Sequence, residues 1–170
     1  VKADKCVASF EPVPPRPAKA ARKLDIVLRA SLPRGREGKE GIRPGTVQGI
    51  WLSPKALSEV SRTLYNRISW WLPPVIWPDE EENWQRNIRQ ALRNGARHFV
   101  CNSPWQAAMF PSGEGKKGLS LTAGPFCNIT NVYAVGVLAG MGVDQAIISP
   151  ELAAEDYLTL PAKSPLPLGI

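Results

Sequence analysis

The chain has 170 residues, 44% of them hydrophobic, and its 21 Lys and Arg against 15 Asp and Glu give a formal net charge of +6. No run reaches the roughly 18 apolar residues of a membrane span, and no signal-peptide core is found, so we expect a soluble, cytoplasmic protein without membrane contact. The three cysteines, Cys6, Cys101 and Cys127, are widely separated and odd in number, which indicates neither a disulfide framework nor a zinc knuckle.

The first 23 residues differ from the rest of the chain. Residues 1–23 combine four prolines with several Lys and Arg and show little apolar periodicity, which predicts a basic, Pro-rich linker or tail. We expect one folded α/β domain over residues 24–170. Since the chain begins at Val1 and ends in the apolar run 168–170, we expect it to be a fragment of a larger protein.

Short runs rich in β-branched and apolar residues recur from residue 24 onward. Several are apolar at consecutive positions, as in strands that are buried on both faces of a parallel sheet. The runs cover residues 24–30, 48–52, 68–76, 97–101, 118–123 and 145–148, and a last one opens at Leu166. They predict a mainly parallel sheet.

Two segments between these runs have helical patterns. The first begins at Asp79, where Asp79 and Glu82 have the spacing of a capping box, and it ends at Gly95. The second covers about residues 130–141 and is apolar on nearly all sides, so we expect it to be well covered by the rest of the domain.

A Ser-Pro pair follows three of the strand-like runs, at Ser53-Pro54, Ser103-Pro104 and Ser149-Pro150. Serine as N-cap and proline at the first helical position predict that each pair opens a helix. The intervals between the pairs each have room for two strand-plus-helix units. The pattern therefore predicts an α/β fold of repeated β/α units with a mainly parallel sheet, partial and TIM-barrel-like because the chain is shorter than a closed barrel needs.

Ligands of such folds bind at the carboxyl ends of the strands. Asn102 follows one strand-like run, and Asn128 and Asn131 flank the start of the second helix, where free backbone N–H groups attract anions. Glu151 falls at the second position of the helix expected after Ser149. We predict that Asn102, Asn128, Asn131 and Glu151 bind substrate; helix capping alone is the alternative for one of the two later asparagines and for Glu151.

Other reactive residues give weaker patterns. His98, the single histidine, lies at the start of its strand-like run and so opposite the carboxyl ends, which argues against a Ser-His-Asp triad. Cys101 and Cys127 lack a nearby imidazole, so we expect inert, buried thiols, and two cysteines cannot complete a metal site. The cationic loops 33–47 and 111–118 are either solvated or bind phosphate and RNA backbone.

Three segments near the end of the chain resemble a known family. They are 124–131 (Gly-Pro-Phe-Cys-Asn-Ile-Thr-Asn), 134–142 and 147–152 (Ile-Ile-Ser-Pro-Glu-Leu). Over residues 124–170 the chain resembles the collagenase-like peptidase family of unknown catalytic type, numbered thirty-two. The resemblance implies a TIM-barrel-like fold and a bacterial, cytoplasmic peptidase, with some relatives acting as iron–sulfur-dependent factors in RNA or quinone hydroxylation.

The resemblance also implies where the chemistry lies. The family's cysteines would come downstream of the segment resembling 165–170, so we expect no cofactor in this chain and an iron–sulfur cluster only in the full-length protein. The residues that match the family's motifs are Asn128, Asn131, Ser149, Pro150 and Glu151. Their catalytic roles stay open.

Three hypotheses for the function follow. The first is a peptide hydrolase domain that needs the rest of its polypeptide for activity. The second is an RNA- or quinone-hydroxylation factor whose basic residues Arg34, Arg36, Lys116 and Lys117 bind RNA. The third is a non-catalytic scaffold that forms homo-oligomers or docks onto the missing part of the same polypeptide.

Overall fold

The computed structural model describes residues 25–29 and 46–170, and the expected linker 1–23 lies outside these residues. Within them, seven strands form one parallel sheet whose spatial order equals their order in the chain. The strands are β1 (Asp25–Arg29), β2 (Thr46–Trp51), β3 (Ile68–Trp71), β4 (His98–Cys101), β5 (Ser120–Ala123), β6 (Gln145–Ile147) and β7 (Leu168–Gly169). This confirms the predicted α/β fold.

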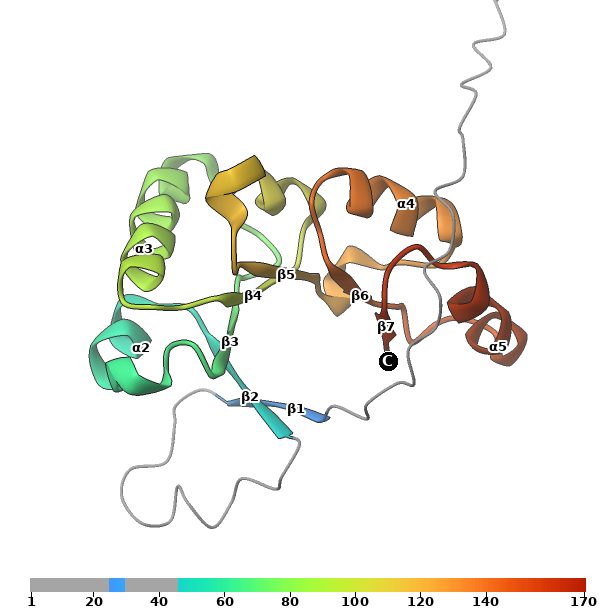
Figure 1. The fold of residues 1–170 in the computed structure, drawn as a ribbon, viewed down its shortest axis with the longest axis horizontal. Helices are drawn as coiled ribbons and strands as arrows, with labels where there is room; N and C mark the ends of the chain where they lie inside the picture. Colours follow the sequence, from blue (N-terminus) through green and yellow to red (C-terminus); the bar gives the residue numbers. More distant parts are fainter. Residues whose placement is uncertain (1–24, 30–45) are drawn as a thin grey trace, which may run out of the picture.

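Helices connect most of the strands and lie along the outer side of the curved sheet (Figure 1). The α-helices are α2 (Pro54–Glu59), α3 (Glu81–Arg93), α4 (Val132–Gly140) and α5 (Ala154–Lys163). Short 3₁₀ helices are η1 (Arg62–Leu64), η2 (Pro78–Glu80), η3 (Pro104–Met109), η4 (Gly113–Lys116) and η5 (Pro125–Cys127). No helix in the described part of the chain is long and apolar enough to cross a membrane.

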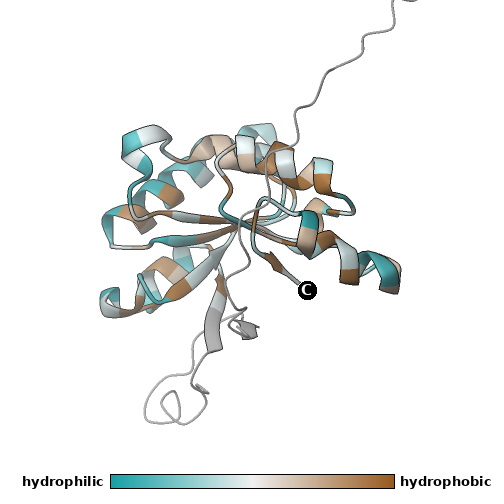
Figure 2. Ribbon diagram, turned by 45° about the vertical axis from the view of Figure 1, so that its right-hand side comes forward, coloured by the Kyte–Doolittle hydropathy of each residue, from teal (hydrophilic) through white to brown (hydrophobic). Residues whose placement is uncertain are grey.

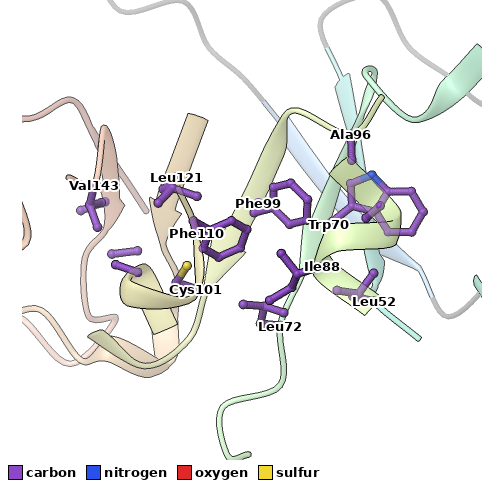
Figure 3. Close-up of a cluster of buried hydrophobic side chains, with 14 of the residues drawn as sticks. Leu52, Trp70, Leu72, Ile88, Ala96, Phe99, Cys101, Phe110, Leu121 and Val143 are labelled. Atoms are coloured by element: carbon purple, nitrogen blue, oxygen red, sulfur yellow. The ribbon is translucent and has the colours of Figure 1, made fainter. Parts of the chain in front are cut away.

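The two faces of the sheet have different roles, because successive side chains of a strand point to opposite sides. One set of strand residues packs against the helices and forms the main core, which includes Trp70, Phe99, Cys101 and Leu121 (Figure 3). Trp71 lies on the other face, where its ring meets that of Trp51 edge-on at a centroid distance of 5.8 Å. The consecutive tryptophans at 70 and 71 thus serve both faces, as their alternation along a strand requires.

The helix expected to begin at Asp79 exists, but its start differs from the prediction. Pro78 opens the 3₁₀ turn η2 with Trp77 as its N-cap, and α3 follows at Glu81 without a side-chain cap. The expected capping box of Asp79 is therefore wrong, because the fixed φ of proline places Asp79 inside the turn. The other end agrees with the sequence, since Gly95 has a φ of +100° just beyond the helix.

The second expected helix is α4, and it is less covered than its composition predicts. Asn131 caps it, because the side-chain oxygen accepts a hydrogen bond of 2.9 Å from the N–H of Ala134. However, Tyr133, Val137 and Met141 remain 63%, 51% and 39% exposed. The expectation of a helix buried on nearly all sides is wrong: only one side of α4 meets the core, and these three large hydrophobic side chains lie on its exposed side. The ribbon coloured by hydropathy shows hydrophobic residues in all the helical layers around the sheet (Figure 2).

The Ser-Pro pairs behave in three ways. Ser53 caps α2 by accepting a 3.1 Å hydrogen bond from the N–H of Ala56, and Ser103 precedes the 3₁₀ helix η3. At Ser149 no helix opens: its hydroxyl accepts from the N–H of Glu151 in a tight turn, and α5 begins only at Ala154. The expected helical position of Glu151 is therefore wrong. The hydroxyl of Ser149 accepts a hydrogen bond from the backbone N–H two residues later, and this local turn takes the place of a helix start.

Candidate functional site

The carboxyl ends of β3, β4 and β5 meet at one edge of the sheet because all three strands are parallel. Asn102, directly after β4, is 1% exposed and donates through Nδ2 to the carbonyl oxygen of Leu72, after β3, at 2.7 Å. Gln106 accepts from the backbone N–H of Asn102 at 2.8 Å and donates to the carbonyl oxygen of Pro73 at 2.7 Å. These buried amides hold the loops after β3 and β4 together.

The same asparagine also contacts the loop after β5. A Cβ atom at Gly124 would lie 2.8 Å from Cγ1 of Val100 and 2.9 Å from Cγ of Asn102, so only glycine fits there. The backbone N–H of Gly124 donates to the carbonyl oxygen of Cys101 at 2.7 Å. The Oδ1 atom of Asn102 is buried with no hydrogen-bond partner in the described part of the chain. We name Asn102, Gln106 and Gly124 the amide hub.

Beyond the hub, two of the predicted site residues lie at the same edge and are exposed. Asn128 ends η5 in the left-handed conformation, with a φ of +47°, which asparagine tolerates better than most residues. Ile129 follows and forms a bridge with Ile148, and the N–H of Ser149 donates to the carbonyl oxygen of Ile129 at 2.9 Å. This pairing brings the segment of Asn128 beside the segment that leads to Glu151, which is also exposed.

The other two predicted site residues already have structural contacts. Asn131 is exposed, but its side-chain oxygen caps α4. Asn102 belongs to the amide hub and has no exposed side-chain surface of note. Of the four residues, Asn128 and Glu151 therefore present their side chains most freely to a ligand at this edge.

The two cysteines lie close together but are poor nucleophiles. Cys127 donates from Sγ to the carbonyl oxygen of Cys101 at 3.3 Å. Burial raises the pKa of Cys101 to about 12, with a smaller contribution from Cys127, and burial raises the pKa of Cys127 to about 11. Both thiols are therefore protonated at neutral pH, and no thiolate is available for attack or for metal binding.

These cysteines also fail to fit an iron–sulfur cluster. Such a cluster takes four ligands, most often thiolates, and the described residues hold only Cys101 and Cys127. No group of three or more His, Cys, Asp or Glu in this part of the chain is arranged to hold a metal ion. His98 is exposed at the start of β4, at the opposite edge of the sheet.

Sequence reasoning missed a set of exposed apolar side chains at the carboxyl edge. Each stands on the segment that follows a strand, after β3, β4 or β5. We name the set the apolar rim; it consists of Val75, Trp77, Trp105 and Phe126, with exposed fractions of 59%, 64%, 41% and 59%. The signal in the sequence is an aromatic residue within a few positions of a strand end; for Trp77 the sequence leaves two interpretations, the core or a substrate groove.

Hydrogen bonds tie the loops of the apolar rim to one another. The hydroxyl of Ser103 donates to the carbonyl oxygen of Pro74 at 2.6 Å, which joins the segment of Val75 to that of Trp105. Gly124 packs against Asn102 two residues before Phe126. The backbone segments that carry the apolar rim are therefore linked to one another, although the side chains of the rim project into solvent.

The cationic loop 111–118 has a structural role at the other edge. Lys116 forms an ion pair of 2.8 Å with Asp144 and also donates to the carbonyl oxygen of Gly142. Asp144 in turn accepts from the N–H of Leu121 at 2.8 Å through its second oxygen. Lys116 is thus already paired, while Lys117 is exposed, and Arg34 and Arg36 lie outside the described residues.

The fold and this edge define an α/β domain with a parallel sheet and a candidate ligand-binding surface at the carboxyl ends of its strands. Comparison of the chain with protein-family models, with curated proteins and with solved structures finds no significant match.

Proposed function

We propose that this domain binds peptides at its carboxyl edge, as part of a cytoplasmic, bacterial peptide hydrolase of the collagenase-like peptidase family. The observation that carries the proposal is the apolar rim, three loops of exposed large apolar side chains, next to the exposed Asn128 and Glu151. A peptide needs both kinds of contact, since its side chains are apolar in part and its backbone is a row of hydrogen-bonding groups.

The chemistry of the carboxyl edge suits a peptide that is neutral or positively charged. Trp77, Trp105 and Phe126 offer flat surfaces on which apolar side chains are buried. The amide of Asn128 can donate to a peptide carbonyl and accept from a peptide N–H, and the carboxylate of Glu151 accepts from N–H groups. Together these groups hold an extended peptide segment, and none of the contacts requires a charge on the peptide.

Neither the cysteines nor the histidine of the described residues suits the reacting groups of a hydrolase. Cys101 and Cys127 are protonated, and His98 lies at the opposite edge of the sheet. The peptide-binding edge then contributes binding and orientation, while the rest of the polypeptide contributes the reacting groups.

The two other hypotheses have less support. RNA binding by loop 111–118 loses one of its two cations, because Lys116 is paired with Asp144. The scaffold hypothesis relies on β1 and β7, the two outermost strands of the sheet, as the strands that pair with a strand of a partner. Salt-independent RNA retention would contradict the first, and a monomer in light scattering would contradict the second.

The proposal is tested by fluorescence anisotropy with fluorescein-labelled peptides from a tryptic digest of casein. We expect Asn128→Gly to weaken binding about fivefold, because one hydrogen bond contributes about 1 kcal/mol, while glycine keeps the left-handed backbone. Asn66→Gly is the matched control, since Asn66 is exposed ahead of β3, at the opposite edge. Equal affinities of the two variants, or no binding to the unaltered chain at about 1 mM, would contradict the proposal.

A further inference from the structure

The apolar rim has an acidic neighbour. Trp77 is the N-cap of η2, and the four residues from Asp79 to Glu82 are carboxylates, all of them exposed. None of the four takes part in a salt bridge within the described part of the chain. The rim therefore has flat aromatic surface beside four exposed carboxylates that form no salt bridge in the described part of the chain, a combination that favours an apolar ligand with positive charges.

The chain itself contains a segment of this chemistry. Residues 12–17 read Pro-Val-Pro-Pro-Arg-Pro, and Lys19, Arg22 and Lys23 follow. Proline-rich sequences favour the polyproline II helix, whose fixed backbone loses little entropy on binding and whose proline rings stack on exposed aromatic side chains. An arginine next to the prolines can stack on a tryptophan ring and face the carboxylates at the same time.

We propose that the segment Pro12–Pro17 of this chain docks on the apolar rim. The prolines cover Trp77 and Trp105, and Arg16 faces the carboxylates of residues 79–82. The basic residues that follow extend the same charge pairing. The segment thus occupies the surface on which the proposed function places a peptide, and it competes with an external peptide for that surface.

The length of chain between Pro17 and the sheet sets how far the segment can reach within one molecule. Residues 18–24 separate Pro17 from Asp25, the first residue of β1, so the two Cα atoms can lie up to roughly 26–29 Å apart. From Asp25, the carboxyl edge lies five residues along the strand direction, and the loop of Trp77 follows β3, two strands away. With strand spacings of about 4.8 Å and rises of about 3.3 Å per residue, the end of β3 lies roughly 20 Å from Asp25, and Trp77 follows six residues beyond that end. A contact within one molecule therefore needs most of the reach of residues 18–24.

The inference relies on the proposed function only in using the same surface, so its test involves neither an external peptide nor hydrolysis. The experiment is hydroxyl-radical footprinting of the intact chain with mass-spectrometric readout of Trp77 and Trp105. It compares the unaltered chain with a variant in which the four prolines are replaced (P12A, P14A, P15A, P17A). We expect labelling of both tryptophans to rise about threefold in the variant, because a tethered ligand at millimolar effective concentration covers the rim most of the time.

A second variant tests the charge pairing. Replacing the carboxylates of residues 79–82 by amides (D79N, E80Q, E81Q, E82Q) should raise the labelling of Trp105 in a chain with intact prolines. The matched control replaces the two acidic residues in the first turn of α5 (E155Q, D156N), which should leave it unchanged. Met141 on α4 serves as the internal reference in every sample, since it is exposed away from the rim.

The dilution series identifies the source of the segment. Protection that is constant with protein concentration indicates the same molecule, and protection that rises with concentration, together with a dimer in light scattering, indicates a second copy. Either result supports docking of Pro12–Pro17. Equal labelling of Trp77 and Trp105 with and without the prolines, at every concentration, would overturn it whether or not casein peptides bind.

Discussion

The two edges of the sheet are held together by different chemistry. At the carboxyl edge, Asn102 and Gln106 link three loops through neutral, buried amides that are 1% and 0% exposed. At the opposite edge, Lys116 and Asp144 link the loop before β5 to the loop before β6 through an ion pair whose side chains are 21% and 42% exposed. Buried polar groups lose far more than exposed ones when a partner is removed, so only the carboxyl edge depends strongly on each of its hydrogen bonds.

The largest effect is expected for Gly124→Ala. The new methyl group would overlap Asn102 and Val100, so we expect a loss of about 3 kcal/mol in the free energy of unfolding. Urea denaturation of the intact chain measures it. Gly140→Ala is the control: no atom lies within 4 Å of its Cβ position, and alanine favours a helix by about 1 kcal/mol over glycine. Equal stability of the two variants would show that the carboxyl edge is loosely packed.

Gln106→Ala removes the second member of the hub. The N–H groups of Asn102 and Ser103 both point at Oε1 of Gln106, and the carbonyl of Pro73 accepts from its amide. Losing these partners in a buried site should cost about 2–3 kcal/mol, measured by the same denaturation. Gln90→Ala, at an exposed position of α3, should change stability by less than about 0.5 kcal/mol. A small cost for Gln106→Ala would mean that water replaces the amide.

The burial of the two thiols at the carboxyl edge predicts a pH dependence of stability. The pKa values of Cys101 and Cys127 are raised from 9.0 to about 12 and about 11 in the folded chain. Folding therefore favours the protonated thiols, and their contribution is fully present below pH 9 and is lost as the pH rises from 9 toward 12. Each thiol that stays protonated only in the folded chain contributes about 1.4 kcal/mol per pH unit, so we expect stability to fall by up to about 3 kcal/mol per pH unit between pH 9 and 11.

A cysteine-free variant isolates this contribution from the titration of lysines. In the variant with Cys101→Ala and Cys127→Ala, the slope of stability between pH 9 and 11 should be smaller than in the unaltered chain. Parallel slopes would show that the thiols are solvated and that burial does not hold their pKa values up.

The smallest effect is expected at the opposite edge. Lys116→Met removes the ion pair with Asp144 and should cost about 0.5 kcal/mol, with a cost that falls as salt is added. Lys117→Met, at the neighbouring exposed position, is the control and should change nothing measurable. A cost as large as that of Gln106→Ala would remove the difference between the two edges.

The sequence predicted the α/β fold and the approximate positions of most strands, because parallel strands read as short apolar runs whatever their neighbours are. It placed Asn102, Asn128 and Glu151 at strand ends for the same reason. It could not predict the apolar rim, since the exposure of Trp105 or Phe126 depends on which loops lie beside it. It also failed at Ser149, where a turn competes with a helix for the same hydroxyl.

The contact between Asn102 and Gly124 has an evolutionary consequence. A side chain at position 124 would meet both Asn102 and Val100, so it is tolerated only after both of those residues have become smaller. Each of those earlier changes leaves a hole or an unpaired amide group on its own. Two unfavourable substitutions would therefore have to precede any change at position 124. We therefore expect descendants of this protein to retain this glycine long after the exposed aromatic residues around it have changed.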